Sequence, residues 1–145
     1  MYPGFEGPAA DPKATRELRL EVEEFHAAYC WTLDSGALEH WPEYFTDDAV
    51  YHNIPVQPIK GKKAIGEIFR AFFELMDVSI LEVVNSAANG NVVFTERVDR
   101  FRFAKTGQRL DLPVNGVFEV RDGKIVAFRD YFDLASFEKP SGMKL

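Results

Sequence analysis

Arg97 and Asp99 lie two residues apart and form the pair whose types and spacing most suggest chemistry. Side chains alternate between the two faces of a β-strand, so positions 95, 97, 99, 101 and 103 share one face, which reads Thr, Arg, Asp, Phe, Phe. Asp130, in another strand-like run with Phe128 and Phe132 on its face, supplies a second carboxylate. Charges are costly to bury among aromatic rings unless they are paired and hydrogen-bonded. Two acids and an arginine facing one apolar cavity could therefore take and give protons.

The same residues also fit a simpler interpretation, in which Arg97 pairs with a neighbour on the protein surface. Cross-strand pairs of this kind are common and contribute little to stability, so spacing alone favours this alternative. The opposite face of the strand counts against it, because that face is itself mixed and charged: Phe94, Glu96, Val98, Arg100 and Arg102. Neither face is an ordinary core face, so one of them is predicted to line an unusual site.

Tyr51 and Asn53 form a second pair with the two-residue spacing of a strand. They can be a half-buried tyrosine and a turn-forming asparagine, or a phenol and an amide that hold a water molecule on one face. His52 points the other way and is interpreted as a surface or interface residue. Because His26, His40 and His52 lack the spacing of metal ligands, no metal site is predicted.

The length of 145 residues predicts one domain, residues 1–145, large enough to bury a core. A net charge of −6 without a basic stripe argues against a nucleic-acid partner. No apolar run is long enough to span a bilayer and no signal peptide is recognisable, so no membrane partner is expected. The single cysteine, Cys30, is interpreted as a small core residue and fits a cytoplasmic location.

The elements that position these residues follow from periodicity and turn signals. Residues 1–11 are expected to form a loose arm, followed by a helix from Pro12 to about Ser35–Gly36 and a short second helix with Leu38, Trp41 and Phe45. A strand over 49–54 and an amphipathic helix over 65–76 come next. Four strands are expected over 78–87, 91–104, 108–120 and 124–133, joined by turns at Asn89-Gly90-Asn91, Thr106-Gly107 and Asp122-Gly123.

This order predicts an α+β domain in which a cone-shaped, curved sheet of mixed or antiparallel strands wraps around helices. A sheet of this shape encloses a cavity, and small-molecule sites favour the mouths of such cavities. Phe137 and Leu145, in the C-terminal piece, are placed to close that mouth.

Four segments together resemble the limonene-1,2-epoxide hydrolase family, within the SnoaL-like and NTF2-like superfamily: Tyr51-His-Asn53-Ile-Pro55, Glu96-Arg97-Val98-Asp99, Gly116-Val117-Phe118 and Arg129-Asp130-Tyr131-Phe132-Asp133-Leu134. The resemblance extends from the first helix to about Phe137. It implies a curved sheet wrapped on helices and an epoxide hydrolase that needs no cofactor. The fold alone carries no function, because the superfamily also contains isomerases, cyclases, dehydratases and binding proteins.

The resemblance also implies a role for each polar residue. Asp130 corresponds to the general base, which takes a proton from a water molecule held by Tyr51 and Asn53. Asp99 corresponds to the general acid, which protonates the epoxide oxygen, and Arg97 lies between the two acids. The implied reaction adds water to an epoxide in one step and gives a vicinal diol, without a covalent intermediate.

The apolar lining of the cavity is carried over from the family in the same way. As a set these residues imply an apolar epoxide, cyclic or terpene-like, although for each one alone a core role is the simpler interpretation: Phe72, Met76, Val78, Leu81, Phe101, Leu112, Val114, Phe132, Phe137 and Leu145. By analogy with the family, the outer face of the sheet is expected to pair two copies into a homodimer.

Three alternatives remain open from the sequence. An isomerase or cyclase of the same superfamily would use one acid to abstract a carbon-bound proton, and its site would not need Arg97 between two acids. A small-molecule binding protein would have the apolar cavity without a water held by Tyr51, Asn53 and Asp130. An inverting glycosidase also places two acids across a water, but a closed apolar cone is a poor site for a sugar.

Overall fold

The computed structural model describes residues 12–30 and 41–145. The elements follow in the order α1 (Pro12–Ala28), a 3₁₀ helix η1 (Trp41–Tyr44), β1 (Phe45–Asn53), β2 (Ile59–Lys60), α2 (Lys62–Leu75), β3 (Met76–Asn89), β4 (Val92–Phe103), β5 (Arg109–Arg121), β6 (Lys124–Tyr131) and α3 (Leu134–Ser141). The expected arm over 1–11 lies outside the described residues. Residues 31–40, with Leu38, His40 and the expected helix end at Ser35–Gly36, also lie outside them.

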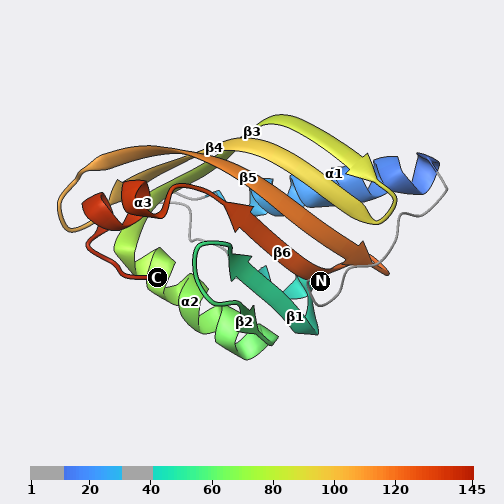
Figure 1. The fold of residues 1–145 in the computed structure, drawn as a ribbon, viewed down its shortest axis with the longest axis horizontal. Coiled ribbons are helices and arrows are strands. Elements are labelled where there is room, and N and C mark those ends of the chain that lie inside the picture. The colour runs from blue at the N-terminus through green and yellow to red at the C-terminus, as the bar shows by residue number, and fades with distance from the viewer. Residues whose placement is uncertain (1–11, 31–40) are drawn as a thin grey trace.

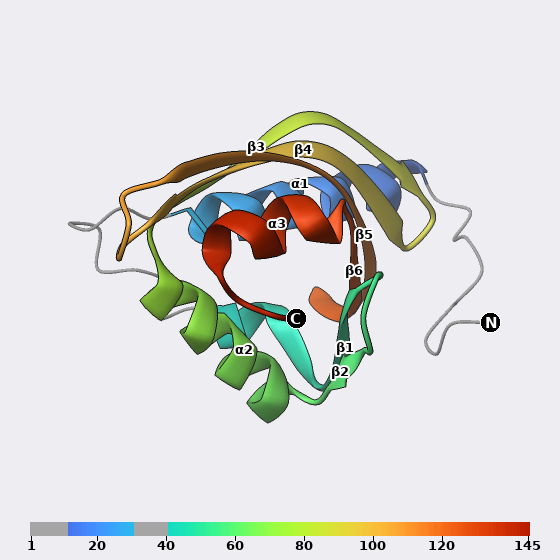
Figure 2. The ribbon, with the colours of Figure 1, turned by 60° about the vertical axis from the view of Figure 1, so that its left-hand side comes forward.

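The strands form one mixed sheet in the order β2-β1-β6-β5-β4-β3. Only β1 and β6 pair in parallel among the described strands, and every other neighbouring pair is antiparallel. The sheet is long and strongly curved, and the helices lie on its concave side (Figures 1 and 2). α1 packs against β3 and β4, and α2 packs against β1. The predicted α+β fold, a curved sheet wrapped around helices, is confirmed.

The predicted bounds of the secondary structure are wrong in two places. α1 ends at Ala28, because its last hydrogen bonds tighten to the three-residue spacing of Cys30 N to Ala27 O, 3.3 Å. Cys30 Sγ then accepts a hydrogen bond from Leu81 N in β3, which ties the chain to the sheet. The short second helix is present as η1, which contains Trp41, but Phe45 does not belong to it, because β1 begins at Phe45, four positions before the expected strand.

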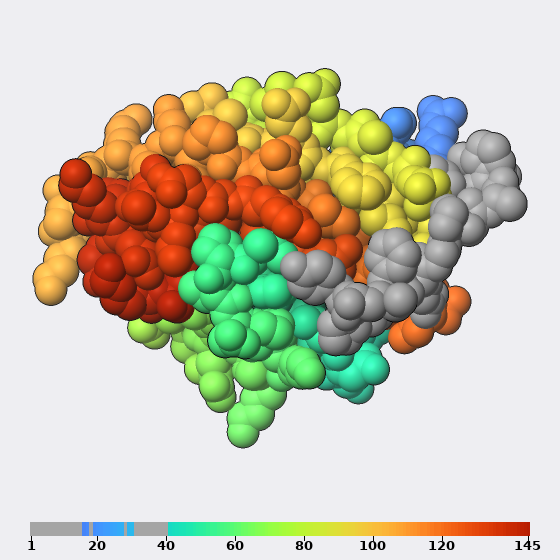
Figure 3. Space-filling view, in the orientation of Figure 1, coloured from blue at the N-terminus to red at the C-terminus, as the bar shows by residue number. Residues whose placement is uncertain are grey.

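Residues 134–141 form a helix, α3, where no element is predicted from sequence. The side chain of Asp133 caps its first turn by accepting a hydrogen bond from Ser136 N at 3.2 Å. Gly142, with a left-handed φ of 68°, ends it. The last strand, β6, ends at Tyr131. The helix α3 and the residues after it form one end of the molecule, beside the segment that joins β1 to β2 (Figure 3).

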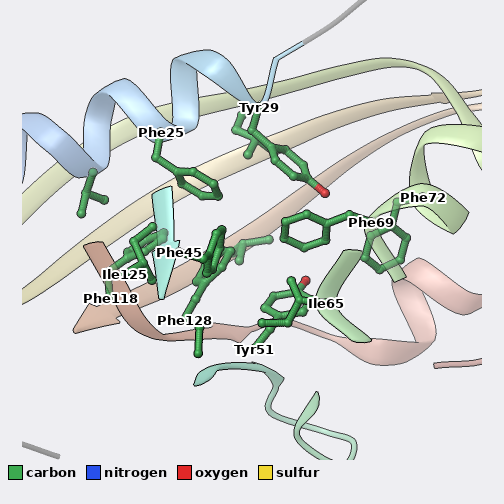
Figure 4. Packing of buried hydrophobic residues seen from close by; sticks show 14 of the residues in the cluster. Phe25, Tyr29, Phe45, Tyr51, Ile65, Phe69, Phe72, Phe118, Ile125 and Phe128 are labelled. Atoms are coloured by element: carbon green, nitrogen blue, oxygen red, sulfur yellow. The ribbon is translucent and has the colours of Figure 1, made fainter. Parts of the chain in front are cut away.

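The core is largely aromatic and fills the part of the cone between α1 and the sheet. Phe25 of α1 makes edge-to-face contacts with Phe45, Phe118 and Phe128, whose ring centroids lie 5.5–5.8 Å away (Figure 4). Phe118 and Phe128 stack on each other at 4.2 Å on neighbouring strands. This packing closes one part of the cone, so the polar residues further along the same strands face the remaining space.

Candidate active site

The inner face of β4 carries both charge and aromatic surface, as the period-two pattern predicts. Thr95, Arg97, Asp99, Phe101 and Phe103 are all buried, whereas the residues between them are half-buried or exposed. The Arg97 side chain is only 1% exposed. The interpretation of Arg97 as a surface residue is therefore wrong.

Arg97 hydrogen-bonds to both aspartates at the same time. Its Nε donates to Asp99 Oδ1 at 2.8 Å and its Nη2 donates to Asp99 Oδ2 at 2.9 Å. Its Nη1 donates to Asp130 Oδ1 at 2.9 Å. Arg97 therefore forms a bidentate pair with the Asp99 carboxylate and a single hydrogen bond with the Asp130 carboxylate.

Tyr51 and Asn53 lie beside Asp130 on the neighbouring strand. β1 and β6 run parallel with Asn53 opposite Asp130, and Ile54 N donates to the backbone oxygen of Asp130 at 2.9 Å. The Tyr51 hydroxyl donates to Asn53 Oδ1 at 3.0 Å, and both side chains are buried. A phenol, an amide and a carboxylate therefore line the same cavity. His52 instead contacts the oxygen of Val56 through Nε2 at 2.7 Å.

These five polar residues lie in the wall of one cavity that is otherwise apolar. The space inside the cavity and its mouth is about 540 Å³. The cavity is lined by the expected apolar residues, with the exception of Val78: Phe72, Met76, Leu81, Phe101, Leu112, Val114, Phe132, Phe137 and Leu145. The lining also includes Phe25, Tyr29 and Phe128, which are not among the expected lining residues. Phe25 belongs to the predicted first helix and Tyr29 directly follows α1, and periodicity cannot separate apolar helix residues that line a cavity from those that pack in the core.

The assignment of Val78 to the cavity is wrong because β3 contains a bulge. The pairing with β4 shifts between Met76 and Val78, so Val78 lies opposite Arg102 and shares the outer face with it. Ser79 takes the inward place, opposite Phe101, and is fully buried. A one-residue shift moves a side chain to the other face of the sheet, and the period-two pattern alone does not reveal it.

The surroundings shift the pKa values of the polar groups. Burial raises the pKa of Asp130 to about 6, although Arg97 acts in the opposite direction. Burial and the charge of Asp130 raise the pKa of the Tyr51 hydroxyl well above its usual range, so Tyr51 remains a neutral hydrogen-bond donor. Burial lowers the pKa of Arg97, but Asp130 and Asp99 outweigh it and raise this pKa overall, so Arg97 remains a cation.

Among residues 12–30 and 41–145, no group of three or more histidine, cysteine or acidic side chains is arranged to hold a metal ion. No helix within these residues is long and apolar enough to cross a membrane.

His26 is a buried histidine on α1. Its ring lies 5.0 Å from the Phe118 ring, and neither ring nitrogen has a hydrogen-bond partner among the described residues. Burial, and then the charge of Arg97, lower the pKa of His26 well below 6.5. The folded protein therefore holds His26 in its neutral form.

This lowered pKa predicts a loss of stability in acid. Below about pH 6.5 the unfolded chain binds a proton at His26 that the folded chain does not, so the free energy of unfolding falls by up to about 1.4 kcal/mol per pH unit from this residue. His26→Phe removes that contribution and is expected to flatten the pH dependence between pH 7 and pH 5, measured by urea unfolding. An unchanged slope in the variant would contradict this account.

The fold is similar to that of SnoaL-like and NTF2-like proteins of known structure. A putative SnoaL-like polyketide cyclase from Jannaschia sp. CCS1 superposes with a TM-score of 0.68 at 18% identity and covers 95% of this chain and 100% of its own. At that identity the likeness concerns the fold alone.

The family follows from closer comparisons. The limonene-1,2-epoxide hydrolase catalytic domain matches residues 21–140, so the chain belongs to this family, as the resemblance predicted. A solved LEH-like epoxide hydrolase from M. tuberculosis has a TM-score of 0.69 at 29% identity and covers 87% of this chain and 90% of its own. Epoxide hydrolase EphG of Mycobacterium tuberculosis is 34% identical over 88 residues, which span 61% of this chain and 57% of EphG. The chain thus matches little more than half of the length of that relative.

Proposed function

We propose that this protein is an epoxide hydrolase that adds water to an apolar epoxide in one step and gives a vicinal diol. One observation carries the proposal: buried Arg97 hydrogen-bonds to both Asp99 and Asp130 beside an apolar cavity. Membership in the epoxide hydrolase family supports it.

In the proposed reaction the water molecule sits between Tyr51, Asn53 and Asp130. Asp130 takes one proton from this water while the water oxygen forms a bond to an epoxide carbon. The bond between that carbon and the epoxide oxygen breaks, and Asp99 gives its proton to the oxygen. The ring opening would otherwise produce an alkoxide, which is a poor leaving group unless it is protonated in the transition state.

The two acids must differ in protonation when the reaction starts, with the proton on Asp99 and Asp130 ionised. After the reaction the positions are reversed, and one proton returns from Asp130 to Asp99 before the next turnover. Arg97 donates hydrogen bonds to both acids, so it can stabilise whichever carboxylate is ionised at each stage. An epoxide oxygen bound next to Asp99 accepts a hydrogen bond from its protonated form, so substrate binding favours the reactive arrangement.

The cavity lining supports an apolar, cyclic or terpene-like substrate. Apart from the polar cluster, its walls are aromatic and aliphatic side chains such as Phe72, Phe101 and Leu112. The bonds that form and break balance with one water molecule and two carboxyl groups, so the proposed reaction uses no cofactor.

Isotope labelling tests the proposed function. A panel of apolar epoxides of increasing ring size identifies a substrate, and a single turnover in oxygen-18 water is then analysed by mass spectrometry. We expect the label in the diol and none in the protein, because the water attacks carbon directly. Label that enters the protein first would indicate an aspartyl ester and overturn the one-step reaction. A panel that yields no diol would overturn the epoxide hydrolase itself.

A further inference from the structure

Gly116 interrupts an otherwise bulky row on the inner face of β5. The other inward residues of this row, Leu112, Val114, Phe118 and Val120, are large, apolar and buried. Glycine in the interior of a strand contributes no packing, and it commonly marks a place where another group approaches the backbone closely. The group that approaches here is the Arg97 side chain.

The sheet order explains why Arg97 comes so close. Arg97 extends from β4 and Asp130 from β6, and β5 lies between these two strands. Neighbouring strands are about 4.8 Å apart, so β4 and β6 are separated by roughly 10 Å. To reach Asp130, the Arg97 side chain must lie across the inner surface of β5. It crosses at Gly116, which lies opposite Asp130 on one side and opposite Thr95 on the other.

A side chain at position 116 would occupy the place of the guanidinium group. A Cβ atom there would lie 2.3 Å from Arg97 Nη1, 2.9 Å from Thr95 Oγ1 and 3.1 Å from Asp130 Oδ1. The first of these nitrogens is the one that donates to Asp130. All three atoms belong to side chains and none to the backbone, so β5 itself can accept a small side chain while the hydrogen bonds of Arg97 cannot remain as they are.

We propose that Gly116 is a positioning residue for the reaction: the absence of a side chain there lets Arg97 cross β5 and hold Asp99 and Asp130 together. Gly116 touches neither the substrate nor the attacking water and acts only through Arg97. The proposal rests on the proposed function for its effect on catalysis, but the position of Arg97 and the titration of Asp130 can be measured without a substrate.

Gly116→Ala is the direct test. We expect a folded protein in which Arg97 moves away from Asp130, and a fall in kcat of about a hundredfold, the loss typical of a catalytic group displaced by an ångström. Because Arg97 lowers the pKa of Asp130, its withdrawal raises that pKa above the value of about 6 in the unaltered protein. Carbon-13 NMR of the aspartate carboxyl groups follows this titration, and a crystal structure shows Arg97.

Asn115→Ala is the matched control, because Asn115 is the preceding residue of β5 and is exposed on the opposite face. It should leave both kcat and the Asp130 titration unchanged. If Gly116→Ala also leaves them unchanged, or leaves both hydrogen-bonded contacts of Arg97 in place, the proposal is overturned. If the unaltered protein hydrolyses no epoxide, the proposed function fails, while the Asp130 titration still decides the role of Gly116.

A second background covers the case in which Gly116→Ala does not fold. Arg97→Met together with Asp99→Asn and Asp130→Asn removes the guanidinium and both acids. If Arg97 is the group that a side chain at position 116 displaces, adding Gly116→Ala to this background lowers the thermal midpoint much less than it does in the unaltered protein, because only Thr95 Oγ1, 2.9 Å from the added Cβ, still has to move. A variant that still fails to fold there would overturn the proposal.

Discussion

Asp130→Asn is expected to lower kcat for diol formation by a factor of about 10³ while the fold is retained. Asparagine has the shape of aspartate and its amide oxygen can still accept the hydrogen bond from Arg97 Nη1. It cannot take a proton from water, so only the general base is lost. Asp99→Asn is expected to abolish diol formation as well, through loss of the general acid. Steady-state kinetics, with circular dichroism to verify folding, make the comparison.

Asp130→Asn should at the same time stabilise the protein at neutral pH. Burial raises the pKa of Asp130 from 3.8 to about 6, so above pH 6 the ionised form costs the folded state roughly 3 kcal/mol. The cost disappears as the pH falls from 6 toward 4, because Asp130 is then neutral in the folded protein. The gain in Tm should therefore be present at pH 8 and nearly absent at pH 4.

Asp111→Asn provides the control for this pair of effects. Asp111 is an exposed acid that pairs with Arg100 on the outer face of the sheet. Its replacement should change neither kcat nor the pH dependence of Tm. Retained diol formation in Asp130→Asn would remove Asp130 from the mechanism. A loss of activity together with a lower Tm at pH 8 would show damage to the fold instead.

The inner face of β4 could be predicted from sequence because it depends only on the period of a strand. Thr95, Arg97 and Asp99 face one way in any strand of this length, whatever its neighbours are. Strand spacing also singled out Asp130 and the pair Tyr51 and Asn53, and the resemblance then implied their roles. The sheet order brings these residues beside Arg97.

The places of Val78 and Gly116 could not be predicted because they depend on pairing between strands. Val78 lies on the outer face because a bulge shifts its register, and bulges leave no mark in the alternation of residue types. The role of Gly116 depends on the position of β5 between β4 and β6, and local sequence does not determine this strand order. The helix α3 is an error of another kind: Asp133 and Gly142 are ordinary signals for a helix start and end, but the strand predicted over 124–133 includes Asp133.

Arg97→Met is expected to lower the free energy of unfolding by about 3–5 kcal/mol at pH 8, the usual cost of removing one partner from a buried ion pair. The substitution keeps an unbranched chain of similar length but leaves Asp99 and Asp130 buried without a cation. The pKa of Asp130 is about 6 even with Arg97 in place, and without Arg97 it rises further, so at pH 5 Asp130 is neutral and much of this loss should be recovered. Urea unfolding at the two pH values measures the difference.

Two further variants separate charge from shape. Arg100→Met removes an arginine from the outer face of the same strand, where its partners Glu82 and Asp111 are exposed, and should have little effect at either pH. Arg97→Lys keeps the cation but loses the planar guanidinium group that hydrogen-bonds to both acids. Relative to Arg97→Met, it should therefore restore more of the stability than of the activity. If Arg97→Met were equally destabilising at pH 5 and pH 8, packing of the side chain would be its main contribution. A loss confined to high pH would show that Arg97 serves chiefly to keep two carboxylates together inside an apolar cavity, which is the arrangement that the proposed chemistry requires.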